Sequence, residues 1–206
     1  MRYGIIIDTH RCDGCQTCAM ACRLSNGLPA GIWWNTVYTD GGETIDTARG
    51  TYPNDLTLQH YPVACQHCQN PACVEVCPTG ASYIDESNGT VQVNNEECIG
   101  CKACMSACPY HVRSYVDGEP VYATDFMTGY VDAPAHVAGT VEKCTMCANL
   151  VSQGERPTCV KACTGYARTF GDLDDPNSEV SKLLASREHI QLLPEQGTNP
   201  SIYYLK

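Results

Sequence analysis

Cysteine dominates this sequence: 16 of its 206 residues are cysteines, and they fall into four groups of four. Setting them aside lowers the 43% hydrophobic fraction to roughly 35%, below the ~45–50% usual for globular chains. A conventional apolar core is therefore thin, and cysteine chemistry must help to hold the fold. The groups, in chain order, are Cys12, Cys15, Cys18, Cys22; Cys65, Cys68, Cys73, Cys77; Cys98, Cys101, Cys104, Cys108; and Cys144, Cys147, Cys159, Cys163.

The spacing within the groups points to iron–sulfur chemistry. Groups one and three read C-x2-C-x2-C-x3-C, group two widens its second gap to four residues, and group four widens it to eleven. This is the ferredoxin pattern, in which three thiolates of one loop bind a 4Fe–4S cluster and the fourth ligates the neighbouring cluster. Pro78 and Pro109, directly after groups two and three, suit the end of a short helix. Motifs of this kind work in pairs, so four motifs predict four 4Fe–4S clusters.

Three other uses of cysteine suit this pattern less well. A disulfide framework suits secreted scaffolds, but no signal peptide is recognisable at the N-terminus, and closely spaced C-x2-C-x2-C loops are poor geometry for local bridges. Structural zinc sites combine two separated C-x2-C pairs rather than three cysteines in seven residues. Thioredoxin-like redox chemistry needs a single C-x2-C. Iron–sulfur binding is the interpretation that uses all sixteen cysteines.

The segment between groups two and three indicates how the motifs pair. Residues 82–85 and 90–93 alternate like strands around a turn at Asn88-Gly89, which predicts a hairpin. A hairpin between two motifs is what a compact two-cluster ferredoxin needs. We therefore predict an α+β fold of two ferredoxin-like double 4Fe–4S modules, one nested inside the other, with loop-rich insertions. Groups two and three form the inner module (62–116), and groups one and four the outer module (1–61 and 117–206).

Cross-ligation within each pair then predicts the ligands of four clusters, named A to D. Sequential pairing, of group one with two and of three with four, stays open as the alternative. The predicted ligands are Cys12, Cys15, Cys18 and Cys163 for cluster A; Cys144, Cys147, Cys159 and Cys22 for cluster B; Cys65, Cys68, Cys73 and Cys108 for cluster C; and Cys98, Cys101, Cys104 and Cys77 for cluster D.

Other segments predict the elements that support these loops. Strands are expected at 3–7, 36–38 and 166–170, the first feeding group one and the last leaving group four. A helix is expected to begin at Asp175, with Asp175 as N-cap and Pro176 at the first helical position. Its apolar face would hold Val180, Leu183, Leu184 and Ile190. Residues 202–205 would form a docking strand or an arm along a partner.

Polar residues near the cysteines are candidates for tuning the clusters. His60, His67 and His111 could hydrogen-bond a sulfur, although a structural or surface role is the more common one for a lone histidine. Cations beside the cysteines would offset the negative charge of the clusters. They are Arg11, Arg23, Lys102, Lys143 and Lys161.

The charge of the protein and the motifs it lacks exclude several classes of function. A net charge of −10 and a pI near 4.9 argue against nucleic acid and against direct adhesion to anionic lipid. No stretch approaches the ~18 apolar residues of a membrane span. The sequence also shows no catalytic triad, phosphate-binding loop or dinucleotide fingerprint. We therefore expect no catalytic site in this chain.

Four ferredoxin motifs, with the fourth stretched to C-x2-C-x11-C-x3-C, resemble the iron–sulfur subunit of the dimethyl sulfoxide reductase (molybdopterin oxidoreductase) family. The resemblance runs from residue 3 to the end of the chain. The stretch 171–176, with Ser178, Val180 and Leu183, is similar to the tails of respiratory arsenate, polysulfide and thiosulfate reductase subunits. Arg23 and Thr164 follow groups one and four, where Thr164 takes the place of a proline found in many relatives, and neither departure removes a ligand.

The resemblance implies an electron-transfer subunit in anaerobic respiration. Its partner would be a large catalytic subunit with molybdenum or tungsten in a bis-pterin guanine dinucleotide cofactor. A membrane anchor linked to quinone, or a cytochrome, would exchange electrons at the other end. Relatives are often exported already folded with the catalytic subunit, so we expect the outer face of the cytoplasmic membrane, with the cytoplasm as the alternative.

Two rival functions stay open. One is a free-standing polyferredoxin that shuttles electrons between soluble partners. The other is an accessory subunit of a non-respiratory molybdoenzyme that acts on an aromatic substrate. The substrate itself would be set by the catalytic partner.

Overall fold

The structure is a computed structural model that describes residues 1–42, 47–122, 124–126 and 128–206. It combines short helices with four small β-sheets, as the predicted α+β class requires. The longest helix in these ranges is α1 (Thr17–Ser25), with nine residues. None of the described helices is long and apolar enough to cross a membrane.

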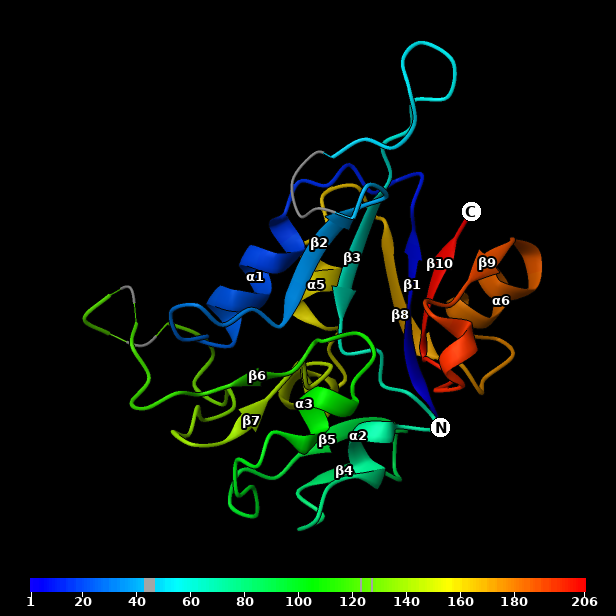
Figure 1. The fold of residues 1–206 in the computed structure, drawn as a ribbon. Helices are drawn as coiled ribbons and strands as arrows, with labels where there is room; N and C mark the ends of the chain where they lie inside the picture. Colours follow the sequence, from blue (N-terminus) through cyan, green and yellow to red (C-terminus); the bar gives the residue numbers. More distant parts are fainter. Residues whose placement is uncertain (43–46, 123, 127) are drawn as a thin grey trace.

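The largest sheet joins distant parts of the sequence. Its strands follow the order β8 (Arg168–Asp172), β1 (Tyr3–Asp8), β10 (Ile202–Leu205) and β9 (His189–Ile190), on the right of Figure 1. The central strand β1 pairs antiparallel with β8 and parallel with β10. The first strand of the protein is therefore completed only by segments that follow more than 150 residues later.

Three consecutive isoleucines in β1 are buried because both faces of the strand are covered. Successive side chains of a strand point to opposite faces. Ile5 and Ile7 pack with Tyr204 on one face, while Ile6 packs with Val180 of α6 (Glu179–Ser186) on the other. This sheet holds much of the conventional apolar core.

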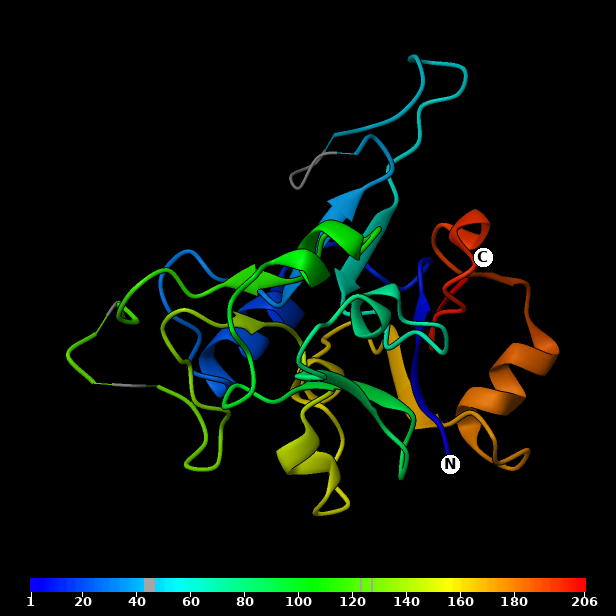
Figure 2. The ribbon, with the colours of Figure 1, turned by 60° about the horizontal axis from the view of Figure 1, so that its bottom comes forward.

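A second sheet lies beside the first. It is formed by β2 (Asn35–Thr39) and β3 (His60–Ala64), which pair antiparallel. The Tyr204 hydroxyl donates a hydrogen bond of 2.9 Å to the Pro62 carbonyl oxygen, which ties β10 to β3. Residues 47–59 project from the body of the molecule at the top of Figures 1 and 2.

The middle of the sequence forms a smaller lobe at the bottom of Figure 1. The hairpin of β4 (Ser82–Asp85) and β5 (Thr90–Val93) lies between α2 (Ala72–Glu75) and α3 (Ala103–Ala107), and these two helices pack together. In the same way, α1 packs on α5 (Thr158–Lys161). The remaining elements are β6 (Ser114–Tyr115), β7 (Val141–Glu142), α4 (Ala148–Val151) and the 3-10 helix η1 (Pro194–Gln196).

The predicted hairpin is confirmed with its strand bounds. Asp85 pairs with Thr90, so the four residues 86–89, with Asn88-Gly89 at their end, connect the strands. The Asp85 carbonyl oxygen accepts from the Gly89 N–H at 2.7 Å, and its carboxylate accepts from the Ser87 N–H at 2.9 Å. Gly89 has φ +71°, which explains glycine at this position.

The predicted helix start at Asp175 is wrong. Ser178 is the N-cap of α6, and its hydroxyl accepts from the Ser181 N–H at 3.2 Å. The Asp175 carboxylate instead accepts from the Asn177 N–H at 2.8 Å in a local turn, so Pro176 precedes the helix rather than opening it. The predicted apolar face loses Ile190, which belongs to β9.

The other predicted strands hold with small shifts. Those at 3–7 and 36–38 lie within β1 and β2. The strand expected at 166–170 runs over 168–172, because Tyr166 has a left-handed φ of 49° that extended structure excludes. Residues 202–205 form β10 in the protein's own sheet. The predicted boundary at 61/62 falls inside β3, and the one at 116/117 follows β6.

Candidate iron–sulfur centres

The four cysteine loops share a backbone device. In each loop the residue just before the second cysteine has a positive φ: Gly14 (71°), His67 (43°), Gly100 (66°) and Met146 (59°). A left-handed residue among right-handed ones turns successive N–H groups into a concave anion-binding nest, which recurs at iron–sulfur sites. Two of the four residues are not glycine and carry a strain of order 1 kcal/mol each. Each loop is therefore shaped to surround an anionic group.

Site A lies between the loop after β1 and the turn before β8. One cavity is lined by all four cysteines predicted for cluster A. Burial raises the pKa of the Cys12 thiol, and Cys18 and Cys163 add to this. Four thiols from groups one and four thus face one enclosed space. The four are Cys12, Cys15, Cys18 and Cys163.

Site B lies deeper, under the isoleucines of β1. Its cavity is lined by the four cysteines predicted for cluster B, together with Ile5 and Ile7. Burial raises the pKa of Cys22 well above its usual value, and the other three thiols of the set add to this. The four are Cys22, Cys144, Cys147 and Cys159.

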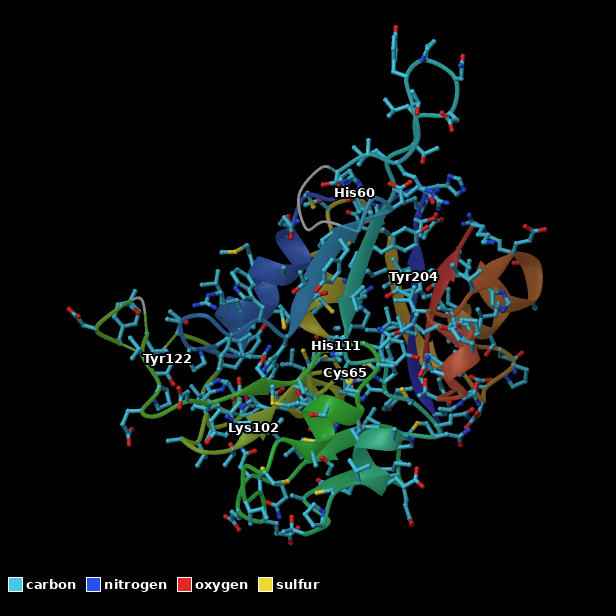
Figure 3. All side chains as sticks on the ribbon, viewed as in Figure 1. His60, Cys65, Lys102, His111, Tyr122 and Tyr204 are labelled. Atoms are coloured by element: carbon cyan, nitrogen blue, oxygen red, sulfur yellow. The ribbon has the colours of Figure 1, made fainter. Side chains whose placement is uncertain are left out.

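Site C lies near the middle of the molecule, where Cys65 is labelled in Figure 3. Burial raises the pKa of Cys68 to about 12, and the thiols of Cys65, Cys73 and Cys108 add to this effect. The four cysteines predicted for cluster C therefore lie close enough to interact. Cys65 also lines the cavity of site B, so the two sites adjoin.

Site D lies beside the hairpin. Its cavity is lined by Cys77, Cys98, Cys101 and Cys104, the set predicted for cluster D. The Ser82 N–H donates to the Cys77 sulfur at 3.4 Å, and the Val141 N–H donates to the Cys98 sulfur at 3.5 Å. Site D thus combines residues of groups two and three, as site C does.

The electrostatics of these sites indicate that a cation belongs in them. Neighbouring buried thiols oppose one another's ionisation, as the raised pKa values at sites A, B and C record. A bound metal reverses this, because a coordinating thiol is deprotonated outright. Backbone N–H groups already point at sulfur, at 3.4 Å from Met146 to Cys144 and 3.2 Å from Ala167 to Cys163. None of the sixteen cysteines is in a disulfide, so the donor set suits 4Fe–4S clusters.

The sites follow one another in the order A, B, C, D. Burial raises the pKa of Cys159 in site B to about 11; Arg168 opposes this, while Cys147 and the site A thiol of Cys18 add to it. The pKa of Cys144 in site B is likewise raised by burial, Cys147 and then the site C thiol of Cys65. Sites C and D both adjoin Arg113.

The two ends of this series are the accessible ones. Cys15 of site A and Cys101 of site D are exposed, whereas every cysteine of sites B and C is buried or half-buried. Sites A and D therefore each present a thiol to solvent, whereas no cysteine of B or C is fully exposed.

Similarity to known proteins extends over almost the whole sequence. The family model described as "4Fe-4S dicluster domain" matches residues 56–124 and 131–173, and that described as "4Fe-4S binding domain" matches residues 9–27. A protein of Halobacterium salinarum that carries the name of a dimethyl sulfoxide reductase iron-sulfur subunit is 45% identical over 98% of this chain and 78% of its own length.

Two further relatives match over nearly their whole length. The arsenate respiratory reductase iron-sulfur subunit of a Shewanella species is 38% identical over 100% of this chain and 97% of its own. A polysulfide reductase chain of Wolinella succinogenes is 37% identical over 98% of this chain and 93% of its own. The protein belongs to this family of iron–sulfur subunits. Members are electron-transfer subunits of reductase complexes with no catalytic site of their own, and they bind 4Fe–4S clusters.

The histidines singled out in this family member take three different positions. The His60 ring lies against Gly14 in the first cysteine loop, where a Cβ would come within 2.3 Å of it. His67 is fully buried, and its Nδ1 accepts from the Val91 N–H at 3.1 Å. His111 is exposed, with a left-handed φ of 51°. For His67 the structural role is the one that the structure shows.

Of the cations expected near the clusters, Lys143 is buried, whereas Arg11, Lys102 and Lys161 are exposed and Arg23 is half-buried. Two buried arginines went unpredicted. Arg113 donates to the Cys73 sulfur at 3.0 Å, and Arg168 donates to the Cys18 sulfur at 3.5 Å. Each follows the last cysteine of its group by five residues, so a repeated C-x4-R pattern could have revealed them.

Proposed function

We propose that this protein binds four 4Fe–4S clusters, at sites A, B, C and D, and relays electrons between a molybdenum or tungsten pterin catalytic subunit and a quinone-linked membrane partner or a cytochrome. The observation that carries the proposal is the unbroken succession of all-thiol sites, with an exposed cysteine at each end. The names of the relatives, reductases of arsenate and polysulfide among them, support a respiratory reductase complex.

The residues have separable tasks in this function. When bound, a 4Fe–4S cluster supplies one-electron redox chemistry. The sixteen thiols would bind four clusters, four thiols to each, in the sets given for clusters A to D. Backbone N–H groups directed at sulfur, as at Cys77, favour the charged state of the ligand. Burial of the cysteines in sites B and C keeps water away from the middle of the series.

The nested arrangement of two modules is part of the proposal. Sites C and D draw all their cysteines from residues 65–108, and sites A and B draw theirs from groups one and four. The packing of α2 on α3, and of α1 on α5, supports two equivalent halves. We place the complex at the outer face of the cytoplasmic membrane, where the catalytic subunit carries this protein during export.

Metal analysis of the anaerobically purified protein tests the cluster count. We expect about sixteen iron and sixteen sulfide per chain, from four sites of four ligands. About four zinc with no sulfide would overturn the proposal. Paramagnetic resonance of the reduced protein should resolve four interacting centres.

Co-purification tests the partner. The tagged protein isolated from its native cell should bring down a large subunit with a pterin cofactor. A protein that is isolated alone, fully loaded with iron and able to exchange electrons with several soluble proteins would instead be a polyferredoxin. A large subunit that transforms an aromatic compound outside respiration would favour the remaining alternative.

A further inference from the structure

A buried arginine lies between sites A and B. Arg168 is only 7% exposed, and its Nη2 donates to the Cys18 sulfur of site A at 3.5 Å and to Asn35 Oδ1 at 3.3 Å. Burial lowers its pKa, but the thiols of Cys159 in site B and Cys18 in site A more than offset this. Within the described residues no carboxylate pairs with Arg168. Its anionic neighbours are the ligands of two adjacent sites.

The same arrangement recurs between sites C and D. Arg113 is 5% exposed, and it donates to the Cys73 sulfur of site C at 3.0 Å and to the Ser82 hydroxyl at 2.9 Å. Burial lowers its pKa, and the thiols of Cys73, Cys65 and Cys104 raise it by more. Cys104 belongs to site D. In the described part of the sequence this guanidinium, too, has no carboxylate partner.

The junction between sites B and C holds a lysine. Lys143 is 2% exposed, and its ammonium donates to the carbonyl oxygens of Val91 at 2.5 Å and Cys144 at 2.8 Å. Its charge acts to lower the pKa of Cys144 in site B and of Cys73 in site C, against the larger effect of burial. Each of the three junctions thus contains one buried cation.

Such cations need anions nearby. Burying a charge away from water is expensive unless it is paired, and removing its partner destabilises the protein strongly. The paired anions here are thiolates, which exist when the sites are loaded. A cluster with four thiolates carries about −2 when oxidised and gains a further negative charge when reduced, which a close cation stabilises.

We propose that Arg168, Lys143 and Arg113 are positioning residues that favour reduction of the two clusters flanking each of them. This rests on the proposed function, since it takes the four sites as cluster sites. A cation shared by two neighbours also weakens the repulsion between them when both are reduced. The reduction potentials of the four clusters would then stay close enough for one electron to pass along the series, although the net charge of the protein is −10.

The test is a redox titration of the purified holoprotein, followed by paramagnetic resonance, for three charge-removing variants. Arg168→Met should lower the potentials of A and B, Lys143→Met those of B and C, and Arg113→Met those of C and D. Each affected centre should show at least a tenfold fall in the ratio of reduced to oxidised form at fixed potential, or about 59 mV for one electron. The overlapping pairs are the signature of junction cations.

Controls separate charge from packing. Lys161→Met removes a cation that also acts on Cys147 of site B but is exposed and paired with Glu155. Solvent screens an exposed charge, so the potential of site B should shift by well under tenfold and those of A, C and D should stay unchanged. Arg168→Lys and Arg113→Lys keep the charge and should keep most of the potential. If a methionine variant assembles poorly, the neutral glutamine variant at the same position must still show the pairwise shift.

The outcomes distinguish this inference from the proposed function. Sixteen iron, four centres and unchanged or uniformly shifted potentials in the variants would overturn the junction cations and leave the electron relay intact. Variants that lose centres other than the flanking pair would also overturn them. Fewer clusters in the unmodified protein would instead contradict the proposed function itself.

Discussion

The two halves of this molecule contain similar sets of cysteines, but different secondary structure holds them in place. Sites C and D lie within a short stretch of sequence, joined by one hairpin and two four- to five-residue helices. Sites A and B are closed by a four-stranded sheet whose partners, such as Ile5 and Ile202, lie at opposite ends of the sequence. The half with sites C and D is made of residues close in sequence and has little apolar core. The half with sites A and B has an apolar core centred on β1.

This difference indicates where stability comes from. Where a small domain cannot bury enough apolar surface, metal binding becomes the folding free energy. The half with sites C and D matches that case, while the β1 sheet supplies hydrophobic burial of its own. Metal ligation and hydrophobic packing therefore contribute in different proportions to the stability of the two halves.

Removing the iron should give the largest effect. Chelation under reducing conditions should abolish native amide protection in the β4–β5 hairpin, because the cluster ligands are what hold its flanking loops. β1 should lose protection too, but later and less completely. Hydrogen exchange measured through the chelation resolves the order, and a hairpin that stays protected without iron would contradict it.

Single ligand changes come next and test the cross-ligation of each half. Cys163→Ser should damage the centre at site A and spare site B, and Cys22→Ser should do the reverse. Serine is a poorer ligand than thiolate for iron, so the open corner should shed its iron and leave a 3Fe centre. In the other half, Cys77→Ser should damage D and Cys108→Ser should damage C. A structure with Cys163 and Cys159 on one cluster would refute the pairing.

A smaller effect is expected from a buried ion pair that ties α1 to the connector before group four. His136 Nδ1 faces Glu142 Oε2 at 2.6 Å and its Nε2 faces the Asn26 carbonyl oxygen at 2.9 Å, so both nitrogens must donate and the ring is charged. Burial lowers the pKa of His136, but the bond to Glu142 more than offsets this and raises it.

Because the folded pKa of His136 is raised, its contribution is complete below the unfolded pKa of ~6.5 and is lost as pH rises through the folded value. His136→Gln should remove this alkaline loss and lower stability by roughly 3 kcal/mol, since Glu142 stays buried without a charged partner and keeps only the Trp34 indole N–H at 3.0 Å. Denaturant unfolding across pH measures both effects. The exposed His189→Gln is the matched control and should keep the wild-type profile.

The smallest effect should come from the cap of α6, which covers only the β1 sheet. Ser178→Ala should cost about 1 kcal/mol, because an orphan N–H at the helix start loses its acceptor. Asp175→Ala should cost less, since Asp175 lies outside the helix. Thermal unfolding of the two variants compares them directly, and equal losses would restore Asp175 as the cap.

The hairpin could be predicted because its strands are a local pattern. The cysteine intervals are local too, and the structure gathers Cys163 with Cys12 and Cys22 with Cys144 around shared cavities, while the ligand sets stay a prediction. Sequence reasoning failed where similar residues compete, since Asp175 and Ser178 are both good N-caps. It also missed Arg113 and Arg168, because arginine is usually exposed and only tertiary packing buries these two.

The long separation between β1 and its partners has a consequence for synthesis. Ile5 pairs with Ile202, and at 5–20 residues per second the ribosome needs roughly 10–40 s to make the residues between them. During that interval a strand with three isoleucines has unpaired edges, which attract other strands. The half with sites C and D emerges complete much earlier. We therefore expect the nascent protein to bind its clusters in two steps, sites C and D first. Between the two steps β1 would need protection from other strands.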